Sequence, residues 1–478
     1  MAEKLLSINY FNGGISSGSK IGLRGSFRWG QGLDIHSDPD RLQIMPKSTK
    51  DSGTTVTDLI LFGSNNTVNA NRYFLGDAGA LYKRTSAGSW SKLSTYTDAQ
   101  GMGFFSGTDK VFFVSGNTEY QLDPSGDTVA SGRSLNSADW HPVETFLDKV
   151  FLGNGRELIS TDASDINLDS DTVGGGIQIE FNFKIKCLRN IGDWLFIGAS
   201  SDNSSVAKYY IWDGTSSTYN FAYTLKGEDG INSVEVGDDG TVLVSAGKQG
   251  HLYQLVNLNT NLKRIKTIPR IEKDKTIETF PGSTENFQGD VLVGLSDGTS
   301  LTAERGIYSW ASTDKNYPHT LNMNYAISSN TTTGVTLQIG CLLAADTNNL
   351  FIGWRDNTTY GVDLISGTGV QSTAIYQSLV HDNGQPFRRK HYKNFKISLS
   401  RVLRTGEVIT LAYKADGASS WTDIGTLNFS VDGAIQTKRF KPDIKSRELE
   451  VQLTFANSGS TAPELDNIAI VFSDEDLI

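Results

Sequence analysis

The sequence predicts an all-β protein, a β-propeller of about seven blades with an N-terminal arm and a C-terminal β-sandwich. Three observations predict this fold. Short apolar runs that end in glycine recur along the 478 residues, glycine is abundant at 49 residues, and the recurring pattern stops near residue 384. Many short strands joined by glycine-rich and polar turns are typical of all-β architectures.

The recurring unit is a pair of strands, of which "DWLFIGAS" followed by "YYIWDG" is an example. An apolar strand suits a position buried on both faces between blades, and the amphipathic second strand suits a half-exposed position. The spacing of the pairs, about 40–60 residues, is close to one four-stranded propeller blade. The first strands begin near Leu59, Val111, Val150, Trp194, Thr241, Val291 and Leu350. Six or eight blades also fit this spacing, and a sandwich or a solenoid of hairpins is the alternative architecture.

Three regions follow from where the pattern starts and stops. Residues 1–55 form an N-terminal arm that could also supply a strand to close the ring, and residues 56–384 form the propeller. Residues 385–478 read as about eight alternating strands, which is the size of a β-sandwich. The basic cluster from Arg388 to His391 is interpreted as a solvated face at this boundary.

Composition limits the classes of function. The formal charge of −10 argues against sequence-independent binding of a phosphate backbone, which needs a surplus of Lys and Arg. Cys187 and Cys341 lie in apolar or alternating runs and are interpreted as buried free thiols, although a disulfide between them stays open. The start lacks the apolar stretch of a secretory signal, and no window suits a membrane-spanning helix, so we expect a product made in the cytoplasm.

Two motifs resemble structural elements of known propellers. "IWDG" at 211–214 contains a Trp-Asp dipeptide but lacks the Gly-His that accompanies it in WD repeats, so we interpret it as a coincidence. "YKADGASSWTDIG" at 413–425 resembles an Asp-box but has Ala415 where the box has its first Ser. We expect Tyr413 and Trp421 to pack across a hairpin there.

The chemistry-bearing residues are scattered. "GISSGSKIG" fails the strand–turn–helix context of a nucleophile elbow, and the six histidines never occur as a close pair at metal-ligand spacing. "SDPD" at 37–40 and "GDDG" at 237–240 are interpreted as turns and not as calcium sites. The arginines that a sialidase-like triad would need share no motif: Arg72, Arg189, Arg270 and Arg305. We therefore assign no catalytic, cofactor-binding or metal-binding residue, and we expect no cofactor.

Both ends of the chain resemble proteins of tailed bacteriophages. "YFNGGISSGSKIGLRGSFRWGQGLDIHSDPDRLQI" resembles the N-terminal segment of phage virion proteins, which often begin with an aromatic residue, Asn or Ser, and two glycines. "FKISLSRVLRTGEVITLAYKADGASSWTDIG" and "APELDNIAIVF" are similar to the C-terminal sandwich of tail and neck-associated proteins. A propeller between such ends is similar to the nozzle proteins of short-tailed phages.

The resemblance implies a non-enzymatic virion structural protein, located in the tail or neck. It would act as a conduit or docking hub in an oligomeric ring, in contact with portal, adaptor, tail or fibre proteins and with copies of itself. DNA would pass without specific binding, and the acidic charge fits such a passage. The alternatives are a tail protein that binds a host receptor or glycan, and a propeller glycan hydrolase or depolymerase.

Overall fold

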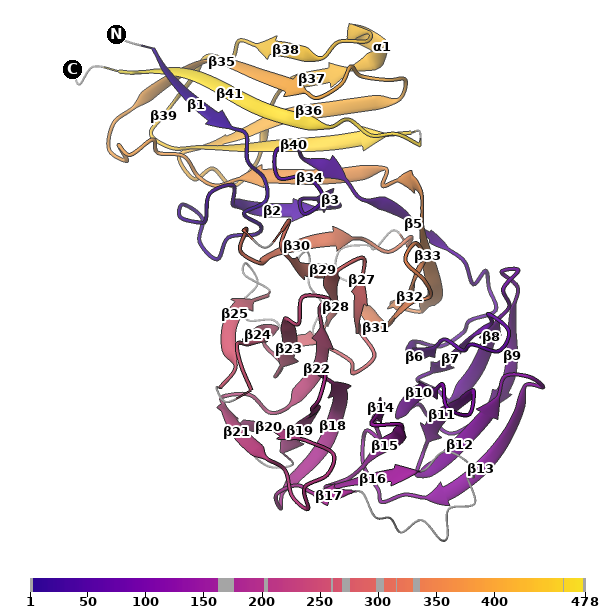
Figure 1. The fold of residues 1–478 in the computed structure, drawn as a ribbon. Coiled ribbons are helices and arrows are strands. Elements are labelled where there is room, and N and C mark those ends of the chain that lie inside the picture. Colours follow the sequence, from indigo (N-terminus) through magenta and orange to yellow (C-terminus); the bar gives the residue numbers. More distant parts are fainter. Residues whose placement is uncertain are drawn as a thin grey trace. The chain divides into compact units, whose positions relative to one another are not determined.

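The computed structural model consists almost entirely of short strands (Figure 1), and α1 (Phe429–Asp432) is the helix among the described residues. The structure describes residues 3–161, 176–201, 205–258, 261–268, 276–297, 305–314, 316–329, 336–458 and 460–475. The chain divides into two compact units. The propeller unit comprises residues 49–307 and 327–364, and the sandwich unit comprises residues 1–48, 308–326 and 365–478.

Five antiparallel sheets of four strands follow one another through the propeller unit, each with its strands in chain order. The first is β6 (Ile60–Ser64), β7 (Arg72–Gly76), β8 (Ala80–Arg84) and β9 (Trp90–Thr95), and the second is β10 (Gly101–Phe105), β11 (Lys110–Ser115), β12 (Thr118–Asp123) and β13 (Thr128–Ser134). The third is β14 (Val143–Phe146), β15 (Lys149–Asn154), β16 (Glu157–Thr161) and β17 (Ile177–Gln178). The fourth is β18 (Phe183–Asn190), β19 (Leu195–Ser201), β20 (Val206–Trp212) and β21 (Phe221–Lys226). The fifth is β22 (Ile231–Val236), β23 (Val242–Ala246), β24 (His251–Leu255) and β25 (Lys263–Thr267).

Two further sheets complete the series. The sixth begins with β26 (Ile277–Glu278), β27 (Thr284–Phe287) and β28 (Asp290–Asp297), after which β29 (Gly306–Ala311) carries the chain into the sandwich unit. The seventh has the order β31 (Leu337–Ala344), β32 (Leu350–Asp356), β33 (Thr359–Val370) and β5 (Pro46–Lys50). Seven sheets in series confirm the predicted β-propeller fold.

The ring is closed by the segment that precedes the first sheet. β5 lies beside β33, so the last sheet takes its outermost strand from the start of the chain. Beyond β5, Asp51 N donates to Val362 O at 2.9 Å and Val362 N donates to Ser52 Oγ at 3.0 Å. A ring of sheets closed in this way leaves only short edges open, which protects an all-β protein from edge-to-edge pairing.

The glycine that ends the recurring apolar run has a packing role. A Cβ on Gly153, Gly198, Gly294 or Gly353 would lie within 2.4–2.8 Å of the isoleucine on the first strand of the next sheet. These isoleucines are, in order, Ile185, Ile231, Ile339 and Ile60. Since Gly353 is in the seventh sheet and Ile60 is in the first, the same contact also joins the two ends of the ring. The dipeptides Ile-Gly, Leu-Gly and Val-Gly that end these apolar runs thus mark positions where neighbouring blades meet.

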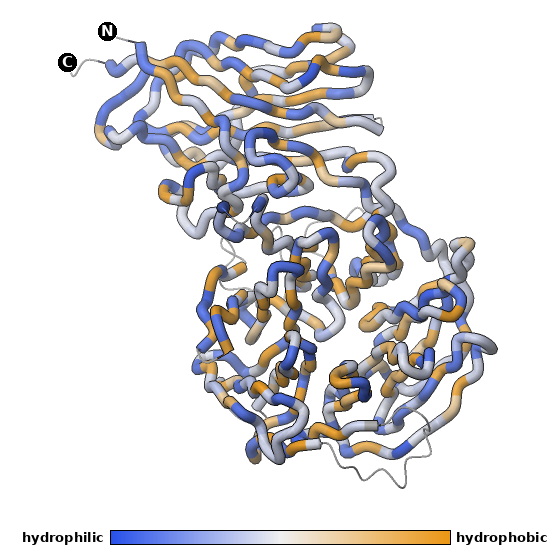
Figure 2. Tube along the Cα trace, in the orientation of Figure 1, coloured by the Kyte–Doolittle hydropathy of each residue, from blue (hydrophilic) through white to orange (hydrophobic). Residues whose placement is uncertain are grey.

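The sandwich unit contains two sheets. One has the order β29, β30 (Thr320–Tyr325), β2 (Phe27–Gln31), β34 (Thr373–Ser378), β40 (Leu449–Asn457), β36 (Glu407–Ala415) and β37 (Thr422–Asn428). The other has the order β1 (Lys4–Ile8), β41 (Leu465–Asp474), β35 (Lys390–Leu399) and β38 (Thr437–Phe440), with β39 (Ile444–Ser446) also on β35. Hydrophobic and hydrophilic residues alternate along these strands (Figure 2), as two packed sheets require. A two-stranded ribbon pairs β3 (Leu33–Asp34) with β4 (Gln43–Ile44).

The two ends of the chain fold together in the sandwich unit. β1 pairs with β41 in antiparallel register from Lys4 with Phe472 to Ile8 with Ile468. Phe11 is fully buried, and its ring meets that of Tyr376 edge-on at 5.6 Å. The compact units therefore divide the chain at places other than residues 55 and 384, because residues 1–48 and 365–384 belong with the C-terminal strands.

Candidate functional site

The propeller encloses a small central cavity to which the first strand of every sheet contributes. The cavity has a volume of about 130 Å³. Its lining residues on these strands are Phe62, Gly63, Met102, Val143, Glu144, Cys187, Leu188, Arg189, Val234, Glu235, Thr284, Glu285, Leu342 and Leu343. Because all seven sheets meet here, the cavity is the axial channel of the propeller.

One side of the channel is charged and the other is apolar. Glu144, Arg189, Glu235 and Glu285 come from four consecutive sheets, the third to the sixth. Each glutamate carboxylate accepts a hydrogen bond from the backbone N–H of the next residue, at 3.0–3.1 Å. The first, second and seventh sheets supply glycine, methionine, phenylalanine and leucine to the rest of the wall.

Arg189 connects the charged side. Its guanidinium donates to Glu235 and lies 3.7 Å from Glu144 Oε2. The Glu235 side chain is 2% exposed whereas 34% of the Arg189 side chain stays accessible, so the arginine faces the cavity. Glu144 and Glu235 therefore share one guanidinium, with Glu285 in the same wall, around a cavity that is large enough for about four water molecules, at ~30 Å³ each.

Burial in this channel changes the acidity of its groups. Burial raises the pKa of Glu144 to about 7, against the attraction of Arg189. Burial and the charge of Glu235 raise the pKa of Glu285 to about 8. Burial opposes the charge of Arg189, but Glu235, Glu144 and Glu285 raise the pKa of its guanidinium above its usual value. Near neutral pH the channel therefore holds protons that exposed glutamates would have released.

The channel cluster is a feature that motif searching did not find. The signal in the sequence is the alignment of four first strands, "PVETF", "CLRNI", "SVEVG" and "STENF", which places Glu144, Arg189, Glu235 and Glu285 at one level. Each of these residues is unremarkable alone among 53 acidic and 43 basic residues. Only the ring brings them together.

The structure separates the arginines considered for a triad. Arg189 is in the channel, Arg305 is bound to Asp297 at 2.8 Å, and Arg72 donates to the Ala345 carbonyl at 3.1 Å. Arg270 lies outside the described residues. Cys187 and Cys341 are free and buried, as predicted, and burial raises the pKa of Cys187 to about 12.

The motifs interpreted as turns are turns. In "GDDG", Gly240 N donates to Gly237 O and Asp239 Oδ1 accepts from Thr241 N. In "SDPD", Asp38 accepts from Asp40 N and pairs with Arg41. Within the described ranges, no group of three or more His, Cys, Asp or Glu side chains is placed to hold a metal ion.

Asp213 of "IWDG" closes a hairpin. It accepts hydrogen bonds from Thr215 N, Ser216 N and Asn220 Nδ2 at 2.7–3.0 Å. In the Asp-box-like turn at 413–425, the expectation was that Tyr413 and Trp421 pack on one another across the hairpin, and the structure gives them different partners. Trp421 carries Lys414 over its ring at 4.8 Å, while Tyr413 pairs with Thr422 across the hairpin.

The interpretation of the basic cluster from Arg388 to His391 as a solvated face is wrong for Lys390. It is fully buried, and its ammonium donates to the carbonyls of Gln385, Arg388 and Arg447 at 2.7–3.0 Å. Burial lowers its pKa, against the pull of nearby carboxylates, of which Asp382 acts most strongly. Lys390 therefore holds together the loop that precedes β35.

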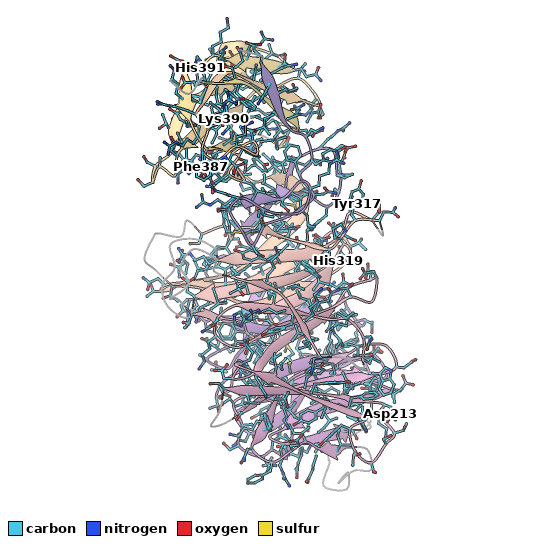
Figure 3. All side chains as sticks on the ribbon, turned by 90° about the vertical axis from the view of Figure 1, so that its left-hand side faces the viewer. Asp213, Tyr317, His319, Phe387, Lys390 and His391 are labelled. Atoms are coloured by element: carbon cyan, nitrogen blue, oxygen red, sulfur yellow. The ribbon has the colours of Figure 1, made fainter. Side chains whose placement is uncertain are left out.

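A second candidate site is the hairpin of β29 and β30 in the sandwich unit. The rings of Trp310 and His319 are stacked with centroids 5.8 Å apart, and Tyr317 lies 37% exposed near the turn (Figure 3). Trp310 Nε1 is buried with no hydrogen-bond partner among the described residues. Trp310 is buried, so Tyr317 and the half-buried His319 are the rings of this group that a flat apolar ligand face could reach.

Comparisons with known proteins assign no family and no function to this chain. No family model matches the chain, and no curated protein matches it. It is similar in structure to a chain of the mitotic checkpoint complex, with 12% identity and a TM-score of 0.47 over 68% of this chain and 94% of that one. It is also similar to a chain of hydrazine synthase from Kuenenia stuttgartiensis, with 8% identity and a TM-score of 0.46 over 65% and 97%. Similarity at this level carries no functional argument.

None of the helices among the described residues is long and apolar enough to cross a membrane. The sheets and the two compact units define the class of this protein: a seven-sheet β-propeller joined to a β-sandwich.

Proposed function

We propose that this chain is a non-enzymatic structural protein of a tailed-bacteriophage virion, a tail or neck component that works in an oligomeric ring. One observation carries the proposal. The N-terminal stretch (residues 10–44) and the C-terminal stretches (395–425 and 462–472) that resemble phage virion proteins fold into the same unit, where Leu42 N donates to Leu465 O at 2.9 Å and Leu465 N donates to Leu42 O at 3.0 Å. Two separate resemblances thus belong to one folded module.

The channel limits how such a protein could conduct DNA. A cavity of about 130 Å³ that is lined by glutamate, arginine and leucine side chains does not admit even an α-helix, which is about 10–12 Å wide. DNA would therefore pass through the opening of a ring of several copies and not through the propeller itself. The propeller would serve as a rigid docking body in the wall of that ring.

The proposal is tested on purified particles from the source lysate. Quantitative mass spectrometry should find the chain in the particles at a fixed copy number relative to the portal protein. A chain that stays in the soluble fraction, with none in the particles, would contradict the proposal.

A second candidate, binding of a host glycan, is favoured by the exposed Tyr317, which lies two positions from the half-buried His319. Sugar rings present apolar faces to which aromatic side chains stack. A glycan array probed with the wild-type chain and with Tyr317→Ala tests it. Binding that the substitution abolishes would favour this function, and a blank array would reject it.

A further inference from the structure

Two exposed loops of the sandwich unit combine basic and large apolar side chains. In the first loop, which lies between Ile15 and β2, Ile21 is 84% exposed and Leu23 is 56% exposed, next to Lys20. In the second loop, which precedes β35, Phe387 is 89% exposed and is followed by Arg388 and Arg389. We call the side chains of these six residues the basic–apolar surface.

The two loops lie beside the same turn. Lys20 of the first loop pairs with Glu448, and Lys390 at the end of the second loop donates to the carbonyl of the adjacent residue, Arg447, at 2.7 Å. Val380 N also donates to Ser19 O at 2.8 Å. Arg447 and Glu448, consecutive residues of one turn, thus hold both loops.

The Phe387 loop is ordered before any partner binds. Phe387 and Lys390 lie on this loop and at its end (Figure 3). The buried Lys390 ammonium binds two of the loop's carbonyls, and Gly384 N and Gln385 N both donate to Asp382. An aromatic ring held 89% exposed on a loop fixed in this way loses little conformational entropy on docking. Exposed aromatic and arginine side chains together are the typical anchors of a protein–protein interface.

The distribution of charge identifies the partner. The sandwich unit contains 20 Lys and Arg against 18 Asp and Glu, a net charge of +2, whereas the remaining residues, the propeller unit, contain 23 against 35, a net charge of −12. Nearby carboxylates such as Glu448 and Asp474 partly neutralise the basic–apolar surface, so apolar contact must supply much of its affinity. This favours a protein partner with acidic charge over a nucleic acid.

We propose that the basic–apolar surface docks on the acidic propeller unit of a second copy of this chain. The inference deepens the proposed function, because a contact between two different surfaces of identical chains is heterologous and builds a ring or a filament. Opposite net charges on the two units would steer the copies into this head-to-tail arrangement.

Sedimentation of the full-length chain over a range of concentrations and at low and high salt tests the proposal. We expect reversible self-association that weakens with salt, and Phe387→Asp should raise its dissociation constant by about tenfold or more. The double variant Arg388→Glu with Arg389→Glu should also weaken self-association, and its loss of affinity should be larger at low salt than at high salt. Matched controls are Val431→Asp, where the valine is 80% exposed on α1, and Arg439→Glu, an exposed residue of β38; both should associate like the wild type.

Three results would overturn the inference. They are a wild-type chain that stays monomeric at every concentration, self-association that the Phe387 and arginine variants leave unchanged, and tight binding of duplex DNA that depends on Arg388 and Arg389 but not on Phe387. These results differ from failure of the proposed function, which is decided separately by the presence of the chain in particles.

Discussion

Gly198 on β19 lies against Ile231 on β22, so close that a Cβ on the glycine would be 2.8 Å from the isoleucine Cγ2. The backbone of one blade therefore rests directly on the side chain of the next. The same contact between Gly353 and Ile60 joins the last sheet to the first. At these junctions the two blades approach closely because the second strand lacks a side chain there.

Replacing this glycine should separate two blades. Gly198→Ala places a methyl group against Ile231 and Cys187, and we expect a loss of about 1–3 kcal/mol in the free energy of unfolding. Urea denaturation followed by tryptophan fluorescence measures the change. Gly126→Ala is the control, because its added Cβ would meet only ordinary contacts with Thr128 at 3.7 Å or more. Equal stability of the two variants would refute the packing role.

The channel predicts a dependence of stability on pH. The folded-state pKa values of Glu144 and Glu285, about 7 and about 8, lie above those of exposed glutamates, so the folded chain binds more protons than the unfolded chain in this range. Stability should therefore fall as the pH rises from about 4.5 to 8. Glu285→Gln should remove part of this loss and add about 1–2 kcal/mol at pH 8.5.

Denaturation curves at pH 5.5 and pH 8.5 measure that effect. Glu3→Gln, at a side chain that is 60% exposed, should leave the wild-type pH dependence in place. If Glu285→Gln lost stability with pH as steeply as the wild type, the glutamate would not be protonated in the folded channel.

Lys390 predicts a strong effect of a buried cation. Lys390→Met leaves three carbonyls without their donor, and we expect a loss of about 2–3 kcal/mol, measured by chemical denaturation. Lys393→Met, at a side chain that is 36% exposed, should cost less than about 0.5 kcal/mol. The account of the loop fails if the two substitutions have the same effect.

A buried acid ties together the fifth sheet. Glu228 lies just before β22, and its carboxylate contacts two residues of β24. It accepts a hydrogen bond from Tyr253 Oη at 2.6 Å and also contacts His251 Nδ1. Tyr253→Phe removes one donor to this carboxylate and should cost about 1–3 kcal/mol. Thermal unfolding by calorimetry provides the measurement, and an unchanged transition temperature would mean that the bond contributes nothing.

The repeating architecture could be predicted from the sequence because the residues that repeat are the buried apolar residues that pack between blades. Strands such as β19 and β23 are buried along nearly their whole length and read as apolar runs, and in β19 the glycine at the blade contact, Gly198, lies within the run. The pairing of β1 with β41 could not be predicted, because it joins residues that are more than 450 positions apart and neither strand carries a local sign of its partner.

The channel and the Lys390 loop were missed for related reasons. Glu144, Arg189, Glu235 and Glu285 are polar residues in otherwise ordinary strands, and only closure of the ring places them around one cavity. Lys390 stands in a basic run that reads as solvent-exposed, and its burial depends on a carbonyl from the distant residue Arg447. Contacts of this kind come from topology and leave no pattern in the local sequence.

The most direct test of the proposed function is cryo-electron microscopy of intact particles from the source lysate, with the propeller and sandwich units fitted as separate bodies. The account predicts a symmetric ring of copies in the tail or neck, with DNA or its path through the centre of the ring and not through a propeller. Absence of this density from every particle, or its presence only at a fibre tip, would contradict the account.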